Sequence, residues 1–210
     1  MTKSKIFVAL LMCAAVCTRA EAQLAEVGGG VSGVFLRGGG DFWGAGLQSA
    51  GIDARGSVSL SDRFALETFV TYGRRSIPVH ESEWTVTGGD TQRVEGLYGI
   101  VVRQRLRAIT RPGFHMFVSY GLGGVYAHET TPARQYKNGR FVFDVPGFSY
   151  TEHDGFLFPM VGVGVHKSVG EHLAIRVEAQ LVTFLSIPAG VRVSAGVAVP
   201  LGGQSTSPSR

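Results

Sequence analysis

Histidine and serine side chains are the groups in this sequence that could carry nucleophilic or acid–base chemistry. Of the six histidines, His115 lies four residues before Ser119, a spacing that places both on one face of a β-strand. Four residues of strand span roughly 13 Å at about 3.3 Å per residue. A nucleophile and its base need hydrogen-bond reach, about 2.6–3.2 Å. We therefore do not expect His115 and Ser119 to form a catalytic pair.

The other candidates for chemistry lie where the sequence predicts connections between strands. A His-x-Ser triplet at 80–82 follows Pro78. The triple glycines at 28–30 and 38–40 are not followed by the helix and Lys-Ser/Thr ending of a phosphate-binding loop. Three further pairs combine histidine with a carboxylate but do not form a converging ligand set: His128 with Glu129, His153 with Asp154, and Glu171 with His172. The sequence predicts no enzyme, no cofactor and no metal site.

Residues 1–22 predict a secretory signal peptide. Lys3 and Lys5 precede an apolar run over 6–16, and small residues stand before the expected cleavage point after Ala22. The run is too short to cross a bilayer as a helix. Cys13 and Cys17 both fall in this segment, so the exported chain is expected to have neither a thiol nor a disulfide.

Net charge and composition limit the classes of protein to which the exported chain can belong. The full chain carries a formal charge of +4, and the predicted cleavage removes three basic residues and one acidic residue, which leaves +2. That charge is too small to predict a nucleic-acid partner. All 30 glycines lie after residue 22, within runs that otherwise read as strands. No later stretch has the roughly 18 consecutive apolar residues of a membrane helix.

A period of two in hydropathy predicts eight strands of 11 to 14 residues, about twice the usual length in globular proteins. The predicted ranges are 24–36, 50–60, 64–74, 93–106, 114–127, 155–166, 173–185 and 191–201. The connections alternate in length. The short ones are 61–63, 107–113 and 167–172, and the long ones are 37–49, 75–92 and 128–154; the last connection, 186–190, is brief. Short turns at one rim and long loops at the other are typical of outer-membrane barrels.

Each strand has one apolar face and one face that mixes charges with Gly, Ala and Ser. An eight-stranded barrel has an interior only just wide enough for side chains, so the mixed face is predicted to point inward. Buried charges need partners, because an unpaired one costs several kcal/mol. The candidates for a charge network in the lumen are Arg55, Glu67, Arg93, Glu95, Arg103, Arg105, Arg176, Glu178 and Arg192. Aromatics near strand ends are predicted to form interfacial girdles: Phe35, Tyr72, Tyr126, Phe64 and Phe114.

From these features the chain resembles the small OmpA-like and OmpX-like outer-membrane barrel superfamily over residues 23–201, with a polar tail at 202–210. The resemblance implies an all-β, eight-stranded antiparallel up-and-down transmembrane β-barrel. The end of the last predicted strand, SAGVAVPL at 194–201, is similar to the signal that the outer-membrane assembly machinery reads, which implies that role for Ser194, Gly196, Val199 and Leu201. Phe184, Phe156 and Phe158 fall on the inward register, where they predict some aromatic packing inside the barrel.

These features favour a non-enzymatic, monomeric outer-membrane protein with a filled lumen and a structural or surface-interaction role through its long loops. Its expected partners are outer-membrane lipids and lipopolysaccharide. The cationic residues that could contact the phosphates of lipopolysaccharide are Arg74, Arg75, Arg134, Lys137 and Arg140. Two alternatives stay open. A soluble lipocalin-like binder would place the apolar register inside. A lipid A-modifying enzyme, as the deacylases with a His-x-Ser pair suggest, would use His80 and Ser82.

Overall fold

The structure is a computed structural model that describes residues 25–36, 48–78, 85–87, 89–138, 141–170, 172–184 and 187–201. All of its regular elements are β-strands. Within these ranges no helix is long and apolar enough to span a membrane. The predicted signal peptide, the His80 to Ser82 triplet and the C-terminal tail lie outside the described residues.

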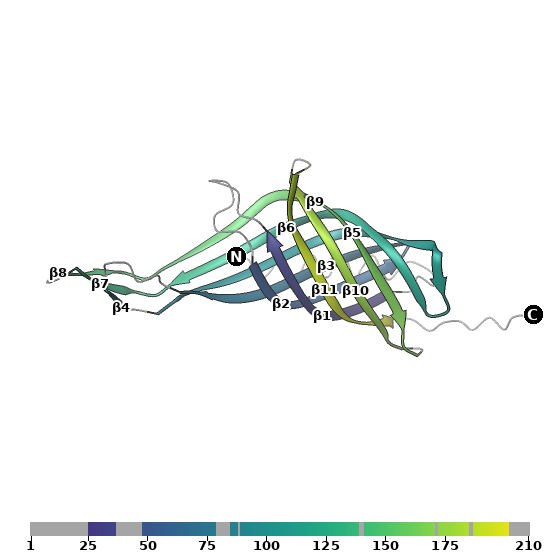
Figure 1. Cartoon of the computed structure of the whole chain (residues 1–210), viewed down its shortest axis with the longest axis horizontal. Helices are drawn as coiled ribbons and strands as arrows, with labels where there is room; N and C mark the ends of the chain where they lie inside the picture. The colour runs from purple at the N-terminus through teal and green to yellow at the C-terminus, as the bar shows by residue number, and fades with distance from the viewer. Residues whose placement is uncertain are drawn as a thin grey trace, which may run out of the picture.

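Eight strands close into one antiparallel barrel in the spatial order β1-β11-β10-β9-β6-β5-β3-β2 (Figure 1). Each barrel strand pairs with the barrel strands that precede and follow it in the sequence. β1 closes the barrel by pairing with β11, with Ala25 opposite Leu201. Their bounds are β1 Ala25–Leu36, β2 Gln48–Ser59, β3 Phe64–Ile77, β5 Thr91–Arg111, β6 Phe114–Thr131, β9 Phe148–Ser168, β10 Ala174–Phe184 and β11 Ile187–Leu201. The prediction of an all-β, eight-stranded antiparallel barrel is confirmed.

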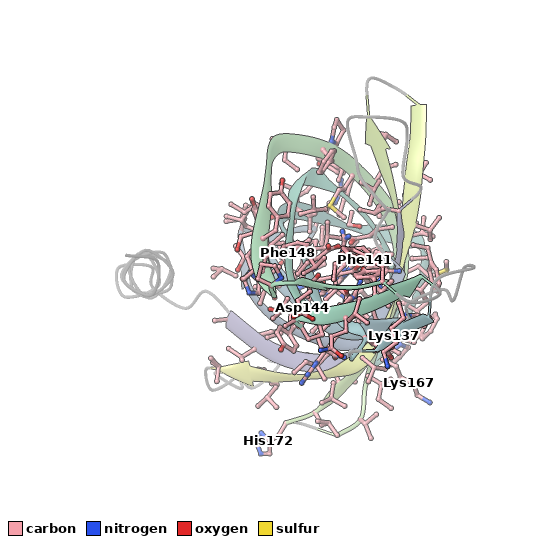
Figure 2. All side chains as sticks on the ribbon, turned by 90° about the vertical axis from the view of Figure 1, so that its left-hand side faces the viewer. Lys137, Phe141, Asp144, Phe148, Lys167 and His172 are labelled. Atoms are coloured by element: carbon pink, nitrogen blue, oxygen red, sulfur yellow. The ribbon has the colours of Figure 1, made fainter. Side chains whose placement is uncertain are left out.

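The prediction of a long loop at 128–154 is wrong, and the predicted loop at 75–92 is shortened, because β3 runs to Ile77 and β5 begins at Thr91. β3, β5, β6 and β9 continue beyond the barrel, and β6 and β9 stay paired out to Thr131 and Phe148. The tips form a second sheet in the order β4-β7-β8, from β4 Thr85–Thr87, β7 Arg134–Asn138 and β8 Phe141–Val145. This sheet lies at the left end of Figure 1, and Figure 2 looks onto it. We call the extended strands with this second sheet the protruding sheet.

The turn end of the molecule is compact by comparison. Leu60 and Ser61 donate their N–H groups to the carbonyl of Phe64, which closes the β2–β3 turn. β5 runs on to Arg111, so the predicted connection at 107–113 shrinks to Pro112 and Gly113, and Gly113 has the positive φ of 70° that a glycine adopts without strain. The predicted asymmetry between the two rims is therefore present, although strands take up most of the predicted loop at 128–154.

The apolar register faces outward and the mixed register faces inward. Val31, Ile52 and Val163 are 63%, 63% and 55% exposed, whereas Arg176 and Arg192 are 2% and 0% exposed. Val193 and Val197 also point outward. Because the two registers alternate on every strand, closing the sheet sends all charges of one register into the narrow lumen. Phe158 is fully buried inside, as the predicted aromatic packing requires.

Glycines allow some strands of the barrel to approach closely. A Cβ added at Gly121 of β6 would stand 2.0 Å from the carbonyl oxygen of Ile100 and 2.6 Å from the Cα of Val101 on β5. Gly121→Ala should therefore lower the free energy of unfolding by about 1–3 kcal/mol, as overpacking does. Gly56→Ala is the control, because its nearest neighbour would be the Thr68 hydroxyl at 4.0 Å. Urea unfolding in detergent micelles measures both, and equal stabilities would contradict the close approach.

Candidate functional site

The turn-side half of the lumen holds a network of arginines and carboxylates, which we call the lumen network. Arg176 of β10 lies between Glu67 of β3, which it contacts, and Glu178, whose Oε2 is 2.5 Å from Arg176 Nη2. Arg192 of β11 donates to Gln180 at 2.8 Å and lies 3.3 Å from Asp53 of β2. Four strands therefore meet through charged groups at the centre of the barrel.

Two more arginines complete the lumen network. Arg55 pairs with Asp53 and lies 3.9 Å from Glu178. Arg103 of β5 pairs with Glu67 at 3.3 Å and with Glu26 of β1 at 3.1 Å. These ion pairs join four guanidinium groups to four carboxylates: Arg55, Arg103, Arg176 and Arg192 to Glu26, Asp53, Glu67 and Glu178. This balance lets the charges stay buried, because each has an opposite partner in low dielectric.

Neutral side chains satisfy further polar atoms of the network and pack against its cations. Ser119 donates to Glu178 at 2.6 Å, and Gln180 donates to the same oxygen at 3.0 Å. The Phe117 ring lies 4.7 Å from the Arg176 guanidinium carbon, and the Phe69 ring lies 4.0 Å from that of Arg192. These distances are within the range of cation–π attraction, which is stronger for desolvated groups.

An apolar layer lies beyond the lumen network, toward the protruding sheet. The inward residues of β5 give the order: Arg103 comes first from the turn end, then Val101 and Leu97, and then Glu95 and Arg93. Residues from six strands pack in this layer: Val34, Leu36, Phe69, Leu97, Val101, Val125, Phe158, Met160 and Val182. Val182, Phe158 and Leu97 are fully buried. The layer separates two charged zones of the lumen.

The second charged zone, the upper network, lies next to the protruding sheet. Glu95 is fully buried between Arg93 at 2.7 Å and Arg75 at 3.0 Å. Arg93 also pairs with Glu129 of β6. The ion pairs of this zone join two arginines to two carboxylates. Thr91 and Thr131 bond across it at 3.2 Å, and Arg134 donates to Thr91 at 2.6 Å.

Of the nine predicted lumen charges, the structure buries all except Arg105. Arg105 is exposed at the turn-side mouth of the barrel, because the lumen register opens to solvent there. The predicted nine also separate into two zones, since Arg93 and Glu95 lie beyond the apolar layer. The predicted excess of arginine is met by carboxylates outside that set: Glu26, Asp53 and Glu129. Asp53 lies two residues before Arg55 and therefore on the same inward face of β2. This spacing, which is visible in the sequence, identifies Asp53 as a lumen carboxylate.

Other residues that the sequence singled out occupy separate places. Ser119 and His115 both face inward on β6, but Ser119 bonds to Glu178 and His115 to His166, so they share no catalytic contact. His128 bonds to Thr151 at 2.6 Å on an exposed part of the protruding sheet. No group of three or more His, Cys, Asp or Glu within the described ranges is placed to hold a metal ion.

The predicted assembly-signal residues all lie on β11, which closes the barrel against β1. Ser194 points into the lumen and is 1% exposed. Val199 and Leu201 point outward and are 42% and 52% exposed. Gly196 pairs with Gly30 of β1, and a Cβ there would stand 2.4 Å from the Gly29 carbonyl oxygen. These residues are therefore part of the closing seam.

The fold and lumen define a closed eight-stranded antiparallel barrel that is charged inside and apolar outside. Among solved structures it is similar to Ail, the attachment invasion locus protein of Yersinia pestis, with 10% identity, a TM-score of 0.51, and coverage of 86% of this chain and 100% of that chain. That similarity confirms the predicted fold and does not by itself assign an activity.

Two further structures are similar at lower TM-scores. The N-terminal β-barrel domain of Pseudomonas aeruginosa OprF has 12% identity and a TM-score of 0.48, and Neisserial surface protein A (NspA) has 12% identity and a TM-score of 0.47. Each match covers 85% of this chain and 97% of that chain. No protein-family model matches the chain. No curated protein matches its sequence either.

Proposed function

We propose that this chain is an integral outer-membrane protein whose barrel spans the bilayer and presents the protruding sheet outside the cell. The observation that carries the proposal is the outward apolar register around a charged lumen. A soluble ligand-binding barrel needs the reverse arrangement, with its apolar register around the ligand. Here Val31, Ile52 and Val163 face outward while the lumen network fills the inside.

The dimensions of the barrel support this location. β1 has 12 residues, which span about 40 Å along the strand and about 28 Å along the membrane normal at a tilt of about 45°. This length matches the hydrocarbon core of a bilayer, about 30 Å thick. Closure also pairs the edges of all eight strands, as lipid requires because it cannot hydrogen-bond a free backbone. Tyr72 and Phe35, both outward and more than half exposed, are placed as girdle residues.

The protruding sheet supports a surface-interaction role. From Phe148 to Phe158, β9 pairs with β6 on one side and with no other strand of the described chain. An open edge of this kind offers N–H and C=O groups to an extended segment of a partner. Phe141, Phe148 and Tyr150 are 68%, 58% and 56% exposed nearby. Figure 2 shows Lys137, Phe141, Asp144 and Phe148 at this end of the molecule.

The proposed membrane location also implies lipid partners. Arg74 is exposed on the outward face of β3, two residues beyond Tyr72, where the apolar register ends. A guanidinium at that level suits the phosphates of lipopolysaccharide. Arg75 instead points inward and pairs with Glu95, and Arg140 lies outside the described residues. Ser194, Gly196, Val199 and Leu201 remain the proposed contact with the assembly machinery, and the proposed state is a monomer without general porin activity.

Heat-modifiable gel mobility tests the proposal most directly. The detergent-extracted protein should migrate differently when it is not boiled, and it should fractionate with outer membranes after removal of the signal peptide. Recovery in the soluble periplasm without detergent would overturn the proposal.

Cysteine labelling tests the orientation of the barrel. Once residues 1–22 are removed the chain has no cysteine, so a single introduced thiol reports its own location. Phe141→Cys, on the protruding sheet, should react with a membrane-impermeant maleimide on intact cells. His172→Cys, exposed at the β9–β10 turn, should react only after the outer membrane is permeabilised. The opposite pattern would mean that the turns face outside.

A further inference from the structure

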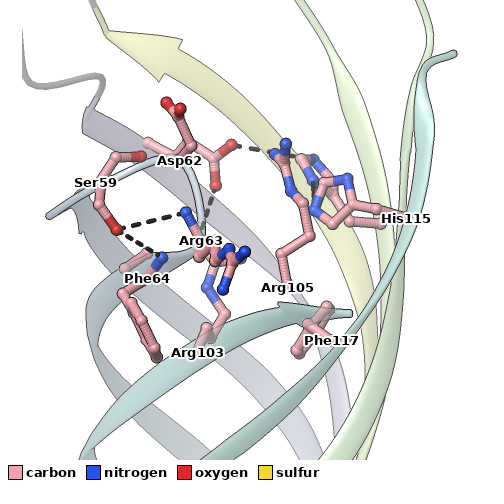
Figure 3. A pocket seen from close by; sticks show the side chains of 12 residues that line it. Ser59, Asp62, Arg63, Phe64, Arg103, Arg105, His115 and Phe117 are labelled. Atoms are coloured by element: carbon pink, nitrogen blue, oxygen red, sulfur yellow. Dashed lines mark hydrogen bonds and ion pairs between the residues drawn. The ribbon is translucent and has the colours of Figure 1, made fainter. Parts of the chain in front are cut away.

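A pocket opens at the turn-side mouth of the barrel, separate from the protruding sheet. It is lined by the β2–β3 turn with Arg63 and Asp62, and by the ends of β1, β5, β6 and β9 (Figure 3). Its volume is about 60 Å³. One water needs roughly 10–15 Å³ of such space, so the pocket has room for a few waters or one small ion.

Guanidinium groups dominate the charge of this pocket. Arg63, Arg103 and Arg105 line it, against the carboxylates of Glu26 and Asp62. The Arg105 N–H donates to the Arg63 carbonyl at 2.8 Å, which fixes these two residues as neighbours at the rim. Figure 3 shows the three arginine side chains entering the same space from the turn and from β5.

The carboxylates do not balance these cations. Glu26 already accepts hydrogen bonds from Arg103 at 3.1 Å and from Ser57 at 3.3 Å. Two guanidinium groups, those of Arg63 and Arg105, therefore share the pocket with one carboxylate, Asp62. The lining consequently repels metal cations and attracts anions.

Two histidines line the pocket and pair with each other. His115 of β6 and His166 of β9 are directly paired, and their facing ring nitrogens, Nε2 and Nδ1, are 3.1 Å apart. The other nitrogen of His166, Nε2, lies 3.9 Å from a Glu26 oxygen. A lone pair there would face a carboxylate, so we assign the proton to Nε2 and the role of acceptor to Nδ1.

This assignment leaves an unused donor inside the pocket. His166 is only 7% exposed, and its Nε2 has no hydrogen-bond partner among the described residues. A buried donor without a partner costs about 1–3 kcal/mol, so an acceptor that reaches it would be stabilised there. Arg63 and Arg105 are exposed at the opening, where an incoming anion would meet them first.

We propose that the turn-side pocket binds a small tetrahedral oxyanion, such as phosphate or the phosphate end of a monoester. Arg63 and Arg105 supply charge-assisted hydrogen bonds to the anion, and His166 Nε2–H supplies one neutral donor deeper in the pocket. Guanidinium groups suit this ligand because their fork of N–H groups matches phosphate oxygens. The proposal does not depend on the membrane location of the barrel.

Titration of the folded protein in detergent with inorganic phosphate, at constant ionic strength set by chloride, tests the proposal. The imidazole NMR signals of His115 and His166 should shift and saturate, while those of His128, far away on the protruding sheet, should not. Glycerol 3-phosphate, titrated in parallel, separates the two sources: a response to both ligands assigns a monoester site, and a response to phosphate alone assigns a free-anion site. Absence of a saturable shift with either ligand would overturn the proposal.

Variants of the rim arginines provide the second measurement. Arg63→Gln and Arg105→Gln should each weaken the apparent affinity for phosphate by about tenfold, since a charge-assisted hydrogen bond is lost. Both residues are exposed, so folding should persist, and heat-modifiable mobility checks this. Lys167→Gln is the control, because Lys167 is exposed near the turn-side end of β9 and does not line the pocket, and it should leave the affinity unchanged. Equal affinity in all three variants would overturn the proposed site, as would saturable binding of Zn²⁺ at the histidine pair.

Discussion

Glu67→Gln is expected to lower the free energy of unfolding by about 3–5 kcal/mol, the cost of removing one partner from a buried ion pair. Glu67 is 1% exposed and is the shared partner of Arg176 and Arg103. The amide keeps the shape of the carboxylate but not its charge. Four guanidinium groups would then face three carboxylates in the lumen network, and Arg176 and Arg192 among them are buried.

Denaturant unfolding in detergent micelles measures this loss, with heat-modifiable mobility as a check that the barrel closes. Arg74→Gln is the control for removing a charge, because Arg74 is exposed and should change stability by no more than about 0.5 kcal/mol. Adding Arg176→Gln to Glu67→Gln restores the charge balance, so the double variant should be more stable than the sum of the two single losses predicts. A loss below about 1 kcal/mol for Glu67→Gln, or strict additivity, would contradict a tightly coupled lumen network.

Val31→Arg is expected to impair insertion into membranes by about 2–4 kcal/mol, the cost of a cationic side chain on the lipid face of a barrel near the bilayer midplane. Val31 stands at the middle of β1 and is 63% exposed on the outward face. Its partners on the neighbouring strands are Ala195 and Ile52, so the arginine would be surrounded by apolar side chains.

Refolding into phospholipid vesicles, followed by the gel shift of the unboiled protein, gives the folded fraction and hence the free energy. Phe141→Arg is the matched control: its side chain is 68% exposed on the protruding sheet, so the same charge should have little effect there. Val31→Leu should also fold normally. If Val31→Arg folded as efficiently as Phe141→Arg, the outer face of β1 would not meet lipid, and the proposed membrane location would fail.

Hydropathy alternation alone predicted the elements that form the barrel wall. The predicted strand at 24–36 is β1 Ala25–Leu36, and the predicted strand at 173–185 is β10 Ala174–Phe184. The same alternation placed Arg55 and Glu67 on the mixed face of their strands. These features are local, because one apolar and one polar environment act on alternate residues of a strand.

The ends of β5, β6 and β9 could not be predicted in this way. Residues 148–151 of β9 are exposed on both faces, so no alternation distinguishes them from a loop. The pairing that makes them a strand comes from β6, through contacts such as Thr130 with Ser149. The second sheet of β4, β7 and β8 likewise depends on segments that are far apart in the sequence.

The sequence by itself determined the eight alternating strands, the composition of their two faces and most of the charges that meet inside. Only the tertiary structure decided that β1 closes on β11, that Arg105 stays at the mouth, and that Glu26, Asp53 and Glu129 neutralise the remaining arginines. The alternation of hydropathy shows that the two faces of the sheet differ, but it does not show which face is enclosed. Closure decides that question, because the lumen of eight strands admits only side chains whose charges are matched across strands, and this matching depends on register and not on local sequence.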